Sequence, residues 1–223
     1  MIVSPEQIAG IGFTSQRTRT RMMRRLIDRG IEHEALLQVM ASVPRHLFVD
    51  EAISSRAYDD VALPIGEGQT ISQPYAVARM TEILLEDGPI ERVLEVGTGS
   101  GYQAAVLSQL VDAVFTVERI STLLDRARKR FKALQYSNIH SRHSDGGWGW
   151  SSHGPFDGII VTAAPPSIPE PLLEQLAIGG RMIVPVGEQN GMQALTIITR
   201  TRRGFSQYRE SDVNFVPFLS GKS

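Results

Sequence analysis

The stretch "RVLEVGTGSGYQAAVL", residues 92–107, decides the fold. Its first five residues have the pattern of a short buried strand, a glycine-rich segment follows, and the remainder has helical spacing. Glycines at such a turn let the backbone bend tightly and approach a ligand closely. A tight turn without a ligand would not require three glycines in five positions. The stretch therefore predicts a ligand-binding loop at residues 97–101.

Strand and helix patterns alternate on both sides of this loop. We expect strands at 92–96, 113–118, 139–145, 156–163, 181–187, 193–201 and 211–219. We expect helices at 33–43, 45–52, 74–88, 102–110, 121–134 (with Ser121 as its cap) and 169–177, the last ended by Gly179 and Gly180. This order predicts an α/β fold with a doubly wound, mostly parallel sheet covered by helices on both faces. The last two strands lack a helix between them, which indicates a C-terminal antiparallel strand.

The chain length of 223 residues suits one α/β domain with an extension. We predict a weakly ordered segment at 1–20 and a single domain at 21–223. Within that domain, residues 21–91 form a helical part with a polar loop, and residues 92–223 form the ligand-binding sheet and the C-terminal strands. Arginines cluster around residues 17–29, and we interpret them as the solvated face of a helix.

Composition excludes several classes of protein. The formal net charge of −1 argues against a chain held to nucleic acid or membrane by bulk charge. No apolar run approaches the roughly 18 residues of a membrane span, and the first residues lack a signal pattern. The absence of cysteine excludes disulfides, and the five histidines show no HExxH pattern, so we predict no metal site. A cytoplasmic monomer is the expectation.

The glycines alone do not distinguish a dinucleotide from S-adenosylmethionine. If the dinucleotide fingerprint starts at Gly97, its third glycine falls on Tyr102. If it starts at Gly99, the variant G-x-G-x-x-A fits through Ala104. Glu118 ends the next strand, where its carboxylate can accept both ribose hydroxyls of either cofactor.

A second acidic residue favours S-adenosylmethionine. Glu95 lies two residues before Gly97, and a carboxylate there would repel a pyrophosphate but attract an ammonium or a sulfonium. Glu95 could instead brace the glycine loop, which also suits a methyltransferase. Asp145 and Gly146 follow the third strand, where Asp145 is placed to accept from an adenine amino group, although an ordinary Asp-Gly turn would give the same pair.

The end of the fourth strand argues against methylation of nucleic-acid bases. Amino-group nucleic-acid methyltransferases carry Asn/Asp-Pro-Pro-aromatic at this place. This chain has Ala164, Pro165, Pro166 and Ser167, so both the polar acceptor and the stacking aromatic are missing.

Taken together, these segments resemble the protein-L-isoaspartate O-methyltransferase family over residues 22–219. The matching segments are "VPRHLFVDEA", "LPIGEGQTISQPY", "VLEVGTGSGYQAAVL", "VERI", "FDGIIVTAAPPSIP" and "GGRMIVPVG". The resemblance implies a protein-repair enzyme. It would transfer a methyl group from S-adenosylmethionine to the free carboxylate of isoaspartyl residues in damaged proteins and peptides, releasing S-adenosylhomocysteine.

The resemblance also assigns roles by position. Ser72 would be the active-site residue, and Val216 and Leu219 would lie with it against the substrate. The residues implied around the cofactor are Thr70, Ile71, Glu95, Gly97, Thr98, Gly99, Ser100, Gly101, Glu118, Asp145 and Gly146. One departure concerns the loop after Asp145, where Gly147 replaces the large residue common in the family.

Ser72 has no obvious base beside it in the sequence. An isoaspartyl carboxylate has a pKa of roughly 4 and is already ionised at neutral pH, so the reaction needs alignment rather than a general base. We therefore interpret Ser72 as a positioned hydroxyl. Ser72 as the N-cap of the helix that follows is the structural alternative. Methylation of another carboxylic acid, or a nicotinamide oxidoreductase, remains as a functional alternative.

The pair Asn190-Gly191 is a turn signal that is also prone to deamidation. We expect it to lie in an exposed turn after the fifth strand. An isoaspartate formed there would make the protein a substrate for another copy of itself.

Overall fold

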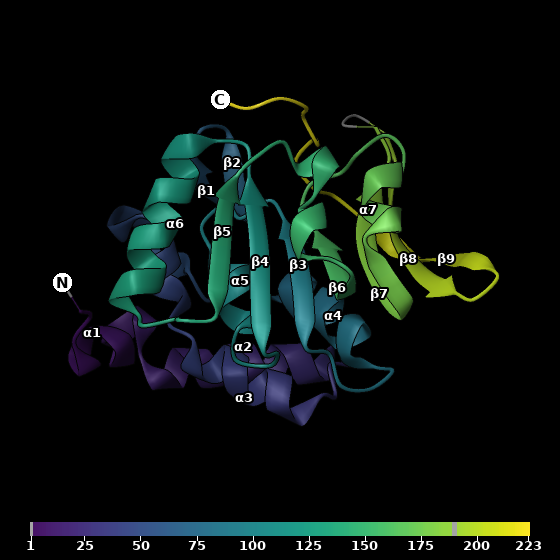
Figure 1. The fold of residues 1–223 in the computed structure, drawn as a ribbon. Coiled ribbons are helices and arrows are strands. Elements are labelled where there is room, and N and C mark those ends of the chain that lie inside the picture. The colour runs from purple at the N-terminus through teal and green to yellow at the C-terminus, as the bar shows by residue number, and fades with distance from the viewer. Residues whose placement is uncertain (1, 189–190) are drawn as a thin grey trace.

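The computed structural model describes residues 2–188 and 191–223. Its main sheet has seven strands in the order β5-β4-β3-β6-β7-β8-β9 (Figure 1). The strands are β3 (Arg92–Val96), β4 (Ala113–Glu118), β5 (Ile139–His143), β6 (Phe156–Val161), β7 (Leu176–Val186), β8 (Gln193–Thr201) and β9 (Gly204–Val213). The first five of these run parallel, and β8 and β9 are antiparallel to their neighbours. The predicted fold class is confirmed.

Helices cover both faces of the sheet. One face carries α4 (Pro74–Leu85), α5 (Tyr102–Leu107) and α6 (Ser121–Ala133), and the other carries α7 (Glu170–Glu174) with the short turns η4 (Gly146–Trp148) and η5 (Ser151–His153). Adjacent residues of β3 point to opposite faces. Val93 joins the apolar cluster that contains Met80 and Phe131, whereas Leu94 joins the cluster that contains Leu172.

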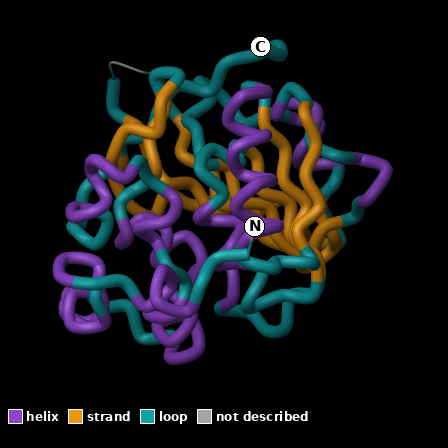
Figure 2. The backbone as a smooth tube through the Cα atoms, turned by 90° about the vertical axis from the view of Figure 1, so that its left-hand side faces the viewer, coloured by secondary structure: helices purple, strands orange, loops and turns teal. Residues whose placement is uncertain are grey.

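The N-terminal part is a third group of helices, below the sheet in Figure 1 and to one side of it in Figure 2. It consists of α1 (Pro5–Ala9), η1 (Gly12–Thr14), α2 (Gln16–Asp28), α3 (Glu34–Ser42), η2 (Arg45–Phe48) and η3 (Glu51–Arg56). The boundary drawn at residue 20 falls inside α2, and weak order before it stays a prediction. The prediction that the arginines form a solvated helix face is wrong for Arg19. Its side chain is 2% exposed and donates to the carbonyl oxygens of Ser42 and Ala9.

The predicted polar loop before α4 is a β-hairpin made of β1 (Leu63–Gly66) and β2 (Gln69–Ile71). Glu67 and Gly68 both have positive φ angles, of 54° and 67°, as a tight two-residue hairpin turn requires. The hairpin rests on α6, because Arg126 donates to Ile65 O at 3.1 Å and Thr122 donates to Glu67 at 2.9 Å. These contacts hold the segment that ends in Ser72 over the sheet.

Four element predictions need correction. The helix expected at 45–52 is two short 3-10 turns, η2 and η3, with Val49 extended between them. The N-cap of α6 is Ile120 rather than Ser121, and it makes no side-chain cap bond. Helix α7 ends at Glu174, and Gly179 and Gly180 lie inside β7. The strand expected at 211–219 ends at Val213, after which the chain leaves β8 and forms a bridge between Pro217 and Ala164.

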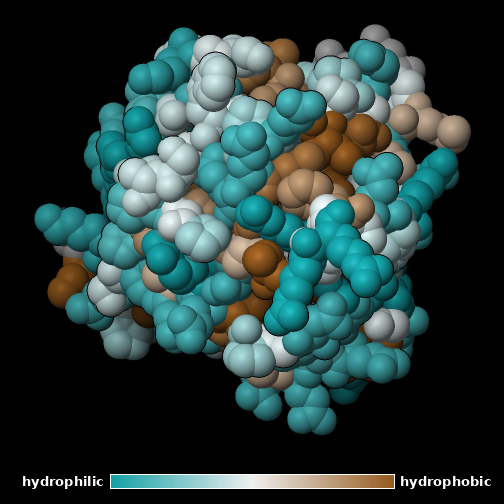
Figure 3. All heavy atoms as spheres, turned by 45° about the vertical axis from the view of Figure 1, so that its right-hand side comes forward, coloured by the Kyte–Doolittle hydropathy of each residue, from teal (hydrophilic) through white to brown (hydrophobic). Residues whose placement is uncertain are grey.

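Hydrophilic residues cover most of the face in Figure 3, and hydrophobic side chains reach this surface in hollows between them. Over the described ranges, 2–188 and 191–223, no helix combines the length and the apolar character needed to cross a membrane. Asn190 lies outside the described residues, so the expected exposed turn at Asn190-Gly191 stays a prediction.

Candidate functional site

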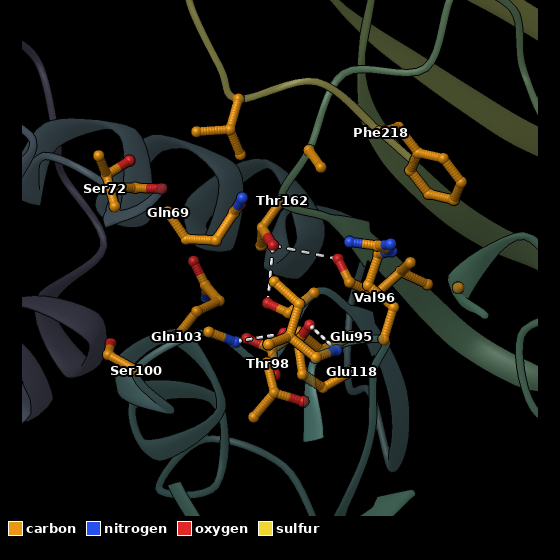
Figure 4. Close-up of a pocket in the computed structure, with 18 of the residues that line it drawn as sticks. Gln69, Ser72, Glu95, Val96, Thr98, Ser100, Gln103, Glu118, Thr162 and Phe218 are labelled. Carbon is orange, nitrogen blue, oxygen red and sulfur yellow. Dashed lines mark hydrogen bonds between the residues drawn. The ribbon is translucent and has the colours of Figure 1, made fainter. Parts of the chain in front are cut away.

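A pocket opens at the carboxyl ends of β3, β4 and β6 (Figure 4). The empty space within it is about 840 Å³, which includes open solvent at its mouth. Four segments supply most of its lining: the hairpin end (69–72), the β3 end with the glycine loop and α5 (95–103), the β4 end (117–120), and residues 216–219. Val77, Gly146, Thr162 and Ala163 complete it. The carboxyl edge of a parallel sheet, where the strand order changes direction, is the usual ligand site of open α/β folds.

The glycine loop approaches β6 so closely that a side chain on Gly97 has no room. Gly97 has a φ of +100°, and a Cβ there would lie 2.3 Å from the hydroxyl oxygen of Thr162. The single proton of the Thr162 hydroxyl is shared between the carbonyl oxygens of Val96 and Gly97, at 3.0 and 2.8 Å, and so fixes this turn (Figure 4). The backbone of the loop is therefore fixed where it lines the pocket, with no side chain on Gly97 between it and a ligand.

Glu95 is fully buried at the base of the pocket. Its Oε2 accepts from Thr116, whose hydroxyl also bonds Thr98 at 2.6 Å, while its Oε1 has no partner among the described residues. Burial raises the pKa of Glu95 to about 8. A buried acceptor without a partner is costly, and a cationic group of a ligand would satisfy it. The buried carboxyl group of Glu95 thus fits a ligand that carries an ammonium or a sulfonium.

Glu118 holds two backbone groups at the rim of the same pocket. Its carboxylate accepts from Gly99 N at 2.8 Å and from Ile120 N at 2.9 Å. Each carboxylate oxygen has a second lone pair, so the side chain can still accept from a diol. Glu118 therefore fixes the glycine loop, and its predicted role as ribose acceptor is compatible with these bonds.

Asp145 is half-buried next to the pocket but is not among the residues that line it, whereas Gly146 is. Its two oxygens accept from Gly147 N at 2.9 Å and from Gly221 N at 2.6 Å. Residues 221–223 cross the ends of β4 and β5, since Ser223 N donates to Arg119 O. The adenine contact of Asp145 stays a prediction. Each of its carboxylate oxygens keeps a lone pair that could accept a hydrogen bond from the adenine amino group.

Ser72 follows β2 directly and lines the pocket. The N-cap of α4 is Gln73, without a side-chain cap bond, so Ser72 does not cap that helix. In the C-terminal segment that also lines the pocket, Ala164 N donates to Val216 O at 2.8 Å and Phe218 N donates to Ala164 O at 2.9 Å. Two segments that are distant in the sequence, 69–72 and 216–219, therefore line the same pocket.

Most of the predicted site residues meet at this pocket. Those that line it are Thr70, Ile71, Ser72, Glu95, Gly97, Thr98, Gly99, Ser100, Glu118, Gly146, Val216 and Leu219. Gly101 is not among them: it is the N-cap of α5, packed against Phe131. Sequence reasoning missed Gln69, Gln103, Arg119 and Thr162, which also line the pocket. Thr162 follows β6 at the carboxyl edge, and that position alone could have identified it.

No group of three or more His, Asp or Glu side chains that could hold a metal ion is found in the described part of the chain. The mixed sheet with its antiparallel strands β8 and β9, the glycine loop and the buried Glu95 fit a Rossmann-like methyltransferase fold.

Comparison with known proteins narrows this class. The family of protein-L-isoaspartate(D-aspartate) O-methyltransferases matches residues 17–223. A protein-L-isoaspartate O-methyltransferase of Halorhodospira halophila is 58% identical over 96% of this chain and 97% of its own length. One from Marinobacter nauticus is 57% identical, with the same coverage of both chains.

Solved structures agree with the sequence matches. A Plasmodium falciparum structure described as a protein-L-isoaspartate O-methyltransferase in complex with S-adenosyl-L-homocysteine is 26% identical. It superposes with a TM-score of 0.79 over 90% of this chain and 98% of that one. Another protein-L-isoaspartate O-methyltransferase has a TM-score of 0.82 at 27% identity, over 89% of this chain and 65% of that one. The chain belongs to the protein-L-isoaspartate(D-aspartate) O-methyltransferase family, which excludes the nicotinamide oxidoreductase alternative.

Proposed function

We propose that this protein transfers a methyl group from S-adenosylmethionine to the free carboxylate of L-isoaspartyl residues in damaged proteins and peptides. One observation supports the proposal most directly: the hairpin end at Ser72 and the glycine loop at 97–101 converge on a single pocket. The hairpin supplies a hydroxyl for the substrate, and the glycine loop supplies backbone for the cofactor.

The residues of the pocket divide the work between cofactor and substrate. When bound, S-adenosylmethionine supplies an electrophilic methyl group on a sulfonium. Glu95 provides the buried acceptor for a cationic group, and Glu118 accepts from the ribose hydroxyls. Thr70, Ile71 and Gly146 contribute walls around the cofactor.

On the substrate side, the Ser72 hydroxyl donates to one oxygen of the isoaspartyl carboxylate and leaves the other free to attack. The carboxylate is ionised at neutral pH, with a pKa of roughly 4, so no side chain needs to remove a proton. Val216 and Leu219 border the same space. They displace water from the nucleophile, which strengthens the alignment that Ser72 provides.

The test is methyl incorporation into an isoaspartyl peptide and into its aspartyl twin of the same sequence. We expect labelling of the isoaspartyl peptide alone. The two peptides differ only in which carboxylate carries the main chain, so labelling both equally would indicate a general carboxyl methyltransferase. No labelling of either peptide by protein that binds S-adenosylhomocysteine would refute the proposal.

Replacing Ser72 with alanine should lower kcat and leave cofactor binding intact. Loss of one hydrogen bond to a charged group costs about 1.5–3 kcal/mol, which is roughly a 10- to 150-fold loss of rate. Ser72→Thr keeps the hydroxyl and serves as the matched control. Steady-state kinetics with the isoaspartyl peptide give kcat, and calorimetry gives the Kd for S-adenosylhomocysteine. A Ser72→Ala enzyme with unchanged kcat would exclude this role for the hydroxyl.

The remaining assignments concern the setting in which the enzyme works. We propose isoaspartyl proteins and peptides as partners, with no nucleic acid and no membrane. A cytoplasmic location and a monomeric state stay predictions, which fractionation and light scattering would test.

A further inference from the structure

Arg45 is a buried residue that contacts the hairpin end of the pocket. It begins η2 and is 0% exposed. Its Nε donates to Ala57 O at 2.7 Å, and its Nη2 donates to Ser72 O at 2.6 Å. The guanidinium carbon lies 4.6 Å from the ring centroid of Tyr102, the first residue after the glycine loop. One side chain thus contacts three segments that are distant in the sequence.

No acid in the described part of the chain forms an ion pair with Arg45, and Asp60 favours its charged form only from beyond ion-pair distance. Within the described residues, its Nη1 has no hydrogen-bond partner. Burial lowers the pKa of Arg45. A buried cation without a carboxylate is costly. Packing alone does not explain such a residue, since an apolar side chain of similar volume would avoid the cost.

The bond to Ser72 supplies an explanation. Arg45 holds the carbonyl oxygen of the residue that lines the pocket at the end of the hairpin. The next turn of the chain is fixed separately, because Asp60 accepts from Tyr75 N at 2.9 Å. Arg45 and Asp60 therefore clamp the backbone on both sides of residues 73 and 74. A charged donor gives a short and directional bond, which is what an alignment role needs.

We propose that Arg45 is a positioning residue for methyl transfer, which acts by fixing the backbone of Ser72 so that its hydroxyl meets the substrate carboxylate. The inference rests on the proposed function of the same pocket. It predicts that Arg45 contributes to rate only through Ser72, and that cofactor affinity is independent of Arg45.

The chain offers a matched control in Arg19. It too is buried, donates to backbone carbonyl oxygens and lies near a tyrosine ring, 5.6 Å from that of Tyr58. Arg19 does not line the pocket and has no bond to Ser72. Any general effect of losing a buried guanidinium from the N-terminal helices should therefore be shared by Arg19 and Arg45 variants.

The experiment is a double-mutant cycle between residues 45 and 72, with Arg45→Lys and Arg45→Met each made in wild type and in Ser72→Ala. Rates with the isoaspartyl peptide are expressed per S-adenosylhomocysteine-binding site, so that partial unfolding does not enter the result. In wild type we expect either Arg45 variant to lower kcat by about tenfold or more, with an unchanged Kd for S-adenosylhomocysteine. In Ser72→Ala the same variants should cause almost no further loss. Arg19→Met should lower the melting temperature and leave kcat per site unchanged.

Several outcomes would overturn the proposal. Equal losses from Arg45 variants with and without the Ser72 hydroxyl would show that Arg45 acts elsewhere. A parallel loss of S-adenosylhomocysteine affinity would make it a general support of the pocket. Failure of both Arg45 variants to fold, beside a folded Arg19→Met, would make it a folding requirement. Wild type that labels no isoaspartyl peptide would refute the proposed function instead.

Discussion

Gly97→Ala is expected to weaken S-adenosylhomocysteine binding by about three orders of magnitude, or roughly 4 kcal/mol. Two costs combine at this position. A φ of +100° is unfavourable for any residue with a side chain, and the new methyl group would lie 2.3 Å from the Thr162 hydroxyl. The loop can relieve the clash only by moving, which breaks the bond from Thr162 to Gly97 O and withdraws backbone from the cofactor.

Gly179→Ala is the matched control. Gly179 has a φ of +88° but nothing within 4 Å of its Cβ position, and it lies in β7. This variant carries the backbone strain without the steric clash, so it should cost about 1–2 kcal/mol of folding stability and leave affinity unchanged. Calorimetric titration of both variants is the measurement. Equal affinity of Gly97→Ala and wild type would mean that the cofactor does not depend on this turn.

S-adenosylhomocysteine binding should release a proton from Glu95. Burial raises the pKa of this carboxyl to about 8, so the protein without ligand holds the proton at pH 7. A ligand ammonium beside Oε1 favours the ionised form and lowers the pKa. Affinity should therefore rise with pH up to about 8, by at most about tenfold per pH unit. Titration calorimetry at pH 7, in two buffers of different ionisation enthalpy, counts the protons released.

Glu95→Gln keeps the shape of the side chain without the titration, so it should bind more weakly and release no proton from this site. The pH dependence of folding stability independently checks whether the pKa of Glu95 is raised in the folded protein. The unfolded chain has the ordinary pKa of 4.5, so the contribution of Glu95 to folding is complete below pH 4.5 and is lost as pH rises to about 8. The free energy of unfolding should fall over that window in wild type more steeply than in Glu95→Gln. Proton uptake on binding by wild type would contradict the assignment.

Local patterns predicted the centre of the fold correctly. Residues 92–107 form β3, the glycine loop and α5, because a buried strand, a glycine turn and a helical face each leave a short-range signal. The hairpin was missed because Glu67 takes a positive φ that usually requires glycine or asparagine. Gly179 and Gly180 resemble a helix stop, yet they lie inside β7, in the irregular stretch between the pairs Leu176–Phe156 and Arg181–Gly158.

The site was predicted where its residues follow strand ends and missed where distant side chains converge. Glu95 and Glu118 could be placed because parallel strands end at one edge. The contact between Arg45 and Ser72 spans 27 positions and has no periodicity to reveal it. Similarly, the sequence of residues 214–219 predicts a strand beside β8. Pro217 instead forms a bridge with Ala164, which follows β6.

The pocket takes its walls from residues 69–72, 95–103 and 216–219, which span most of the chain. A small molecule that contacts all three segments binds the folded protein and not the unfolded chain, since no unfolded segment retains more than one wall. A ligand concentration one hundred times the Kd then adds about 2.7 kcal/mol to the free energy of unfolding. The metabolic supply of methyl donor would thereby set how long each copy of this repair enzyme survives proteolysis, so that cells poor in the donor lose the enzyme as well as its activity.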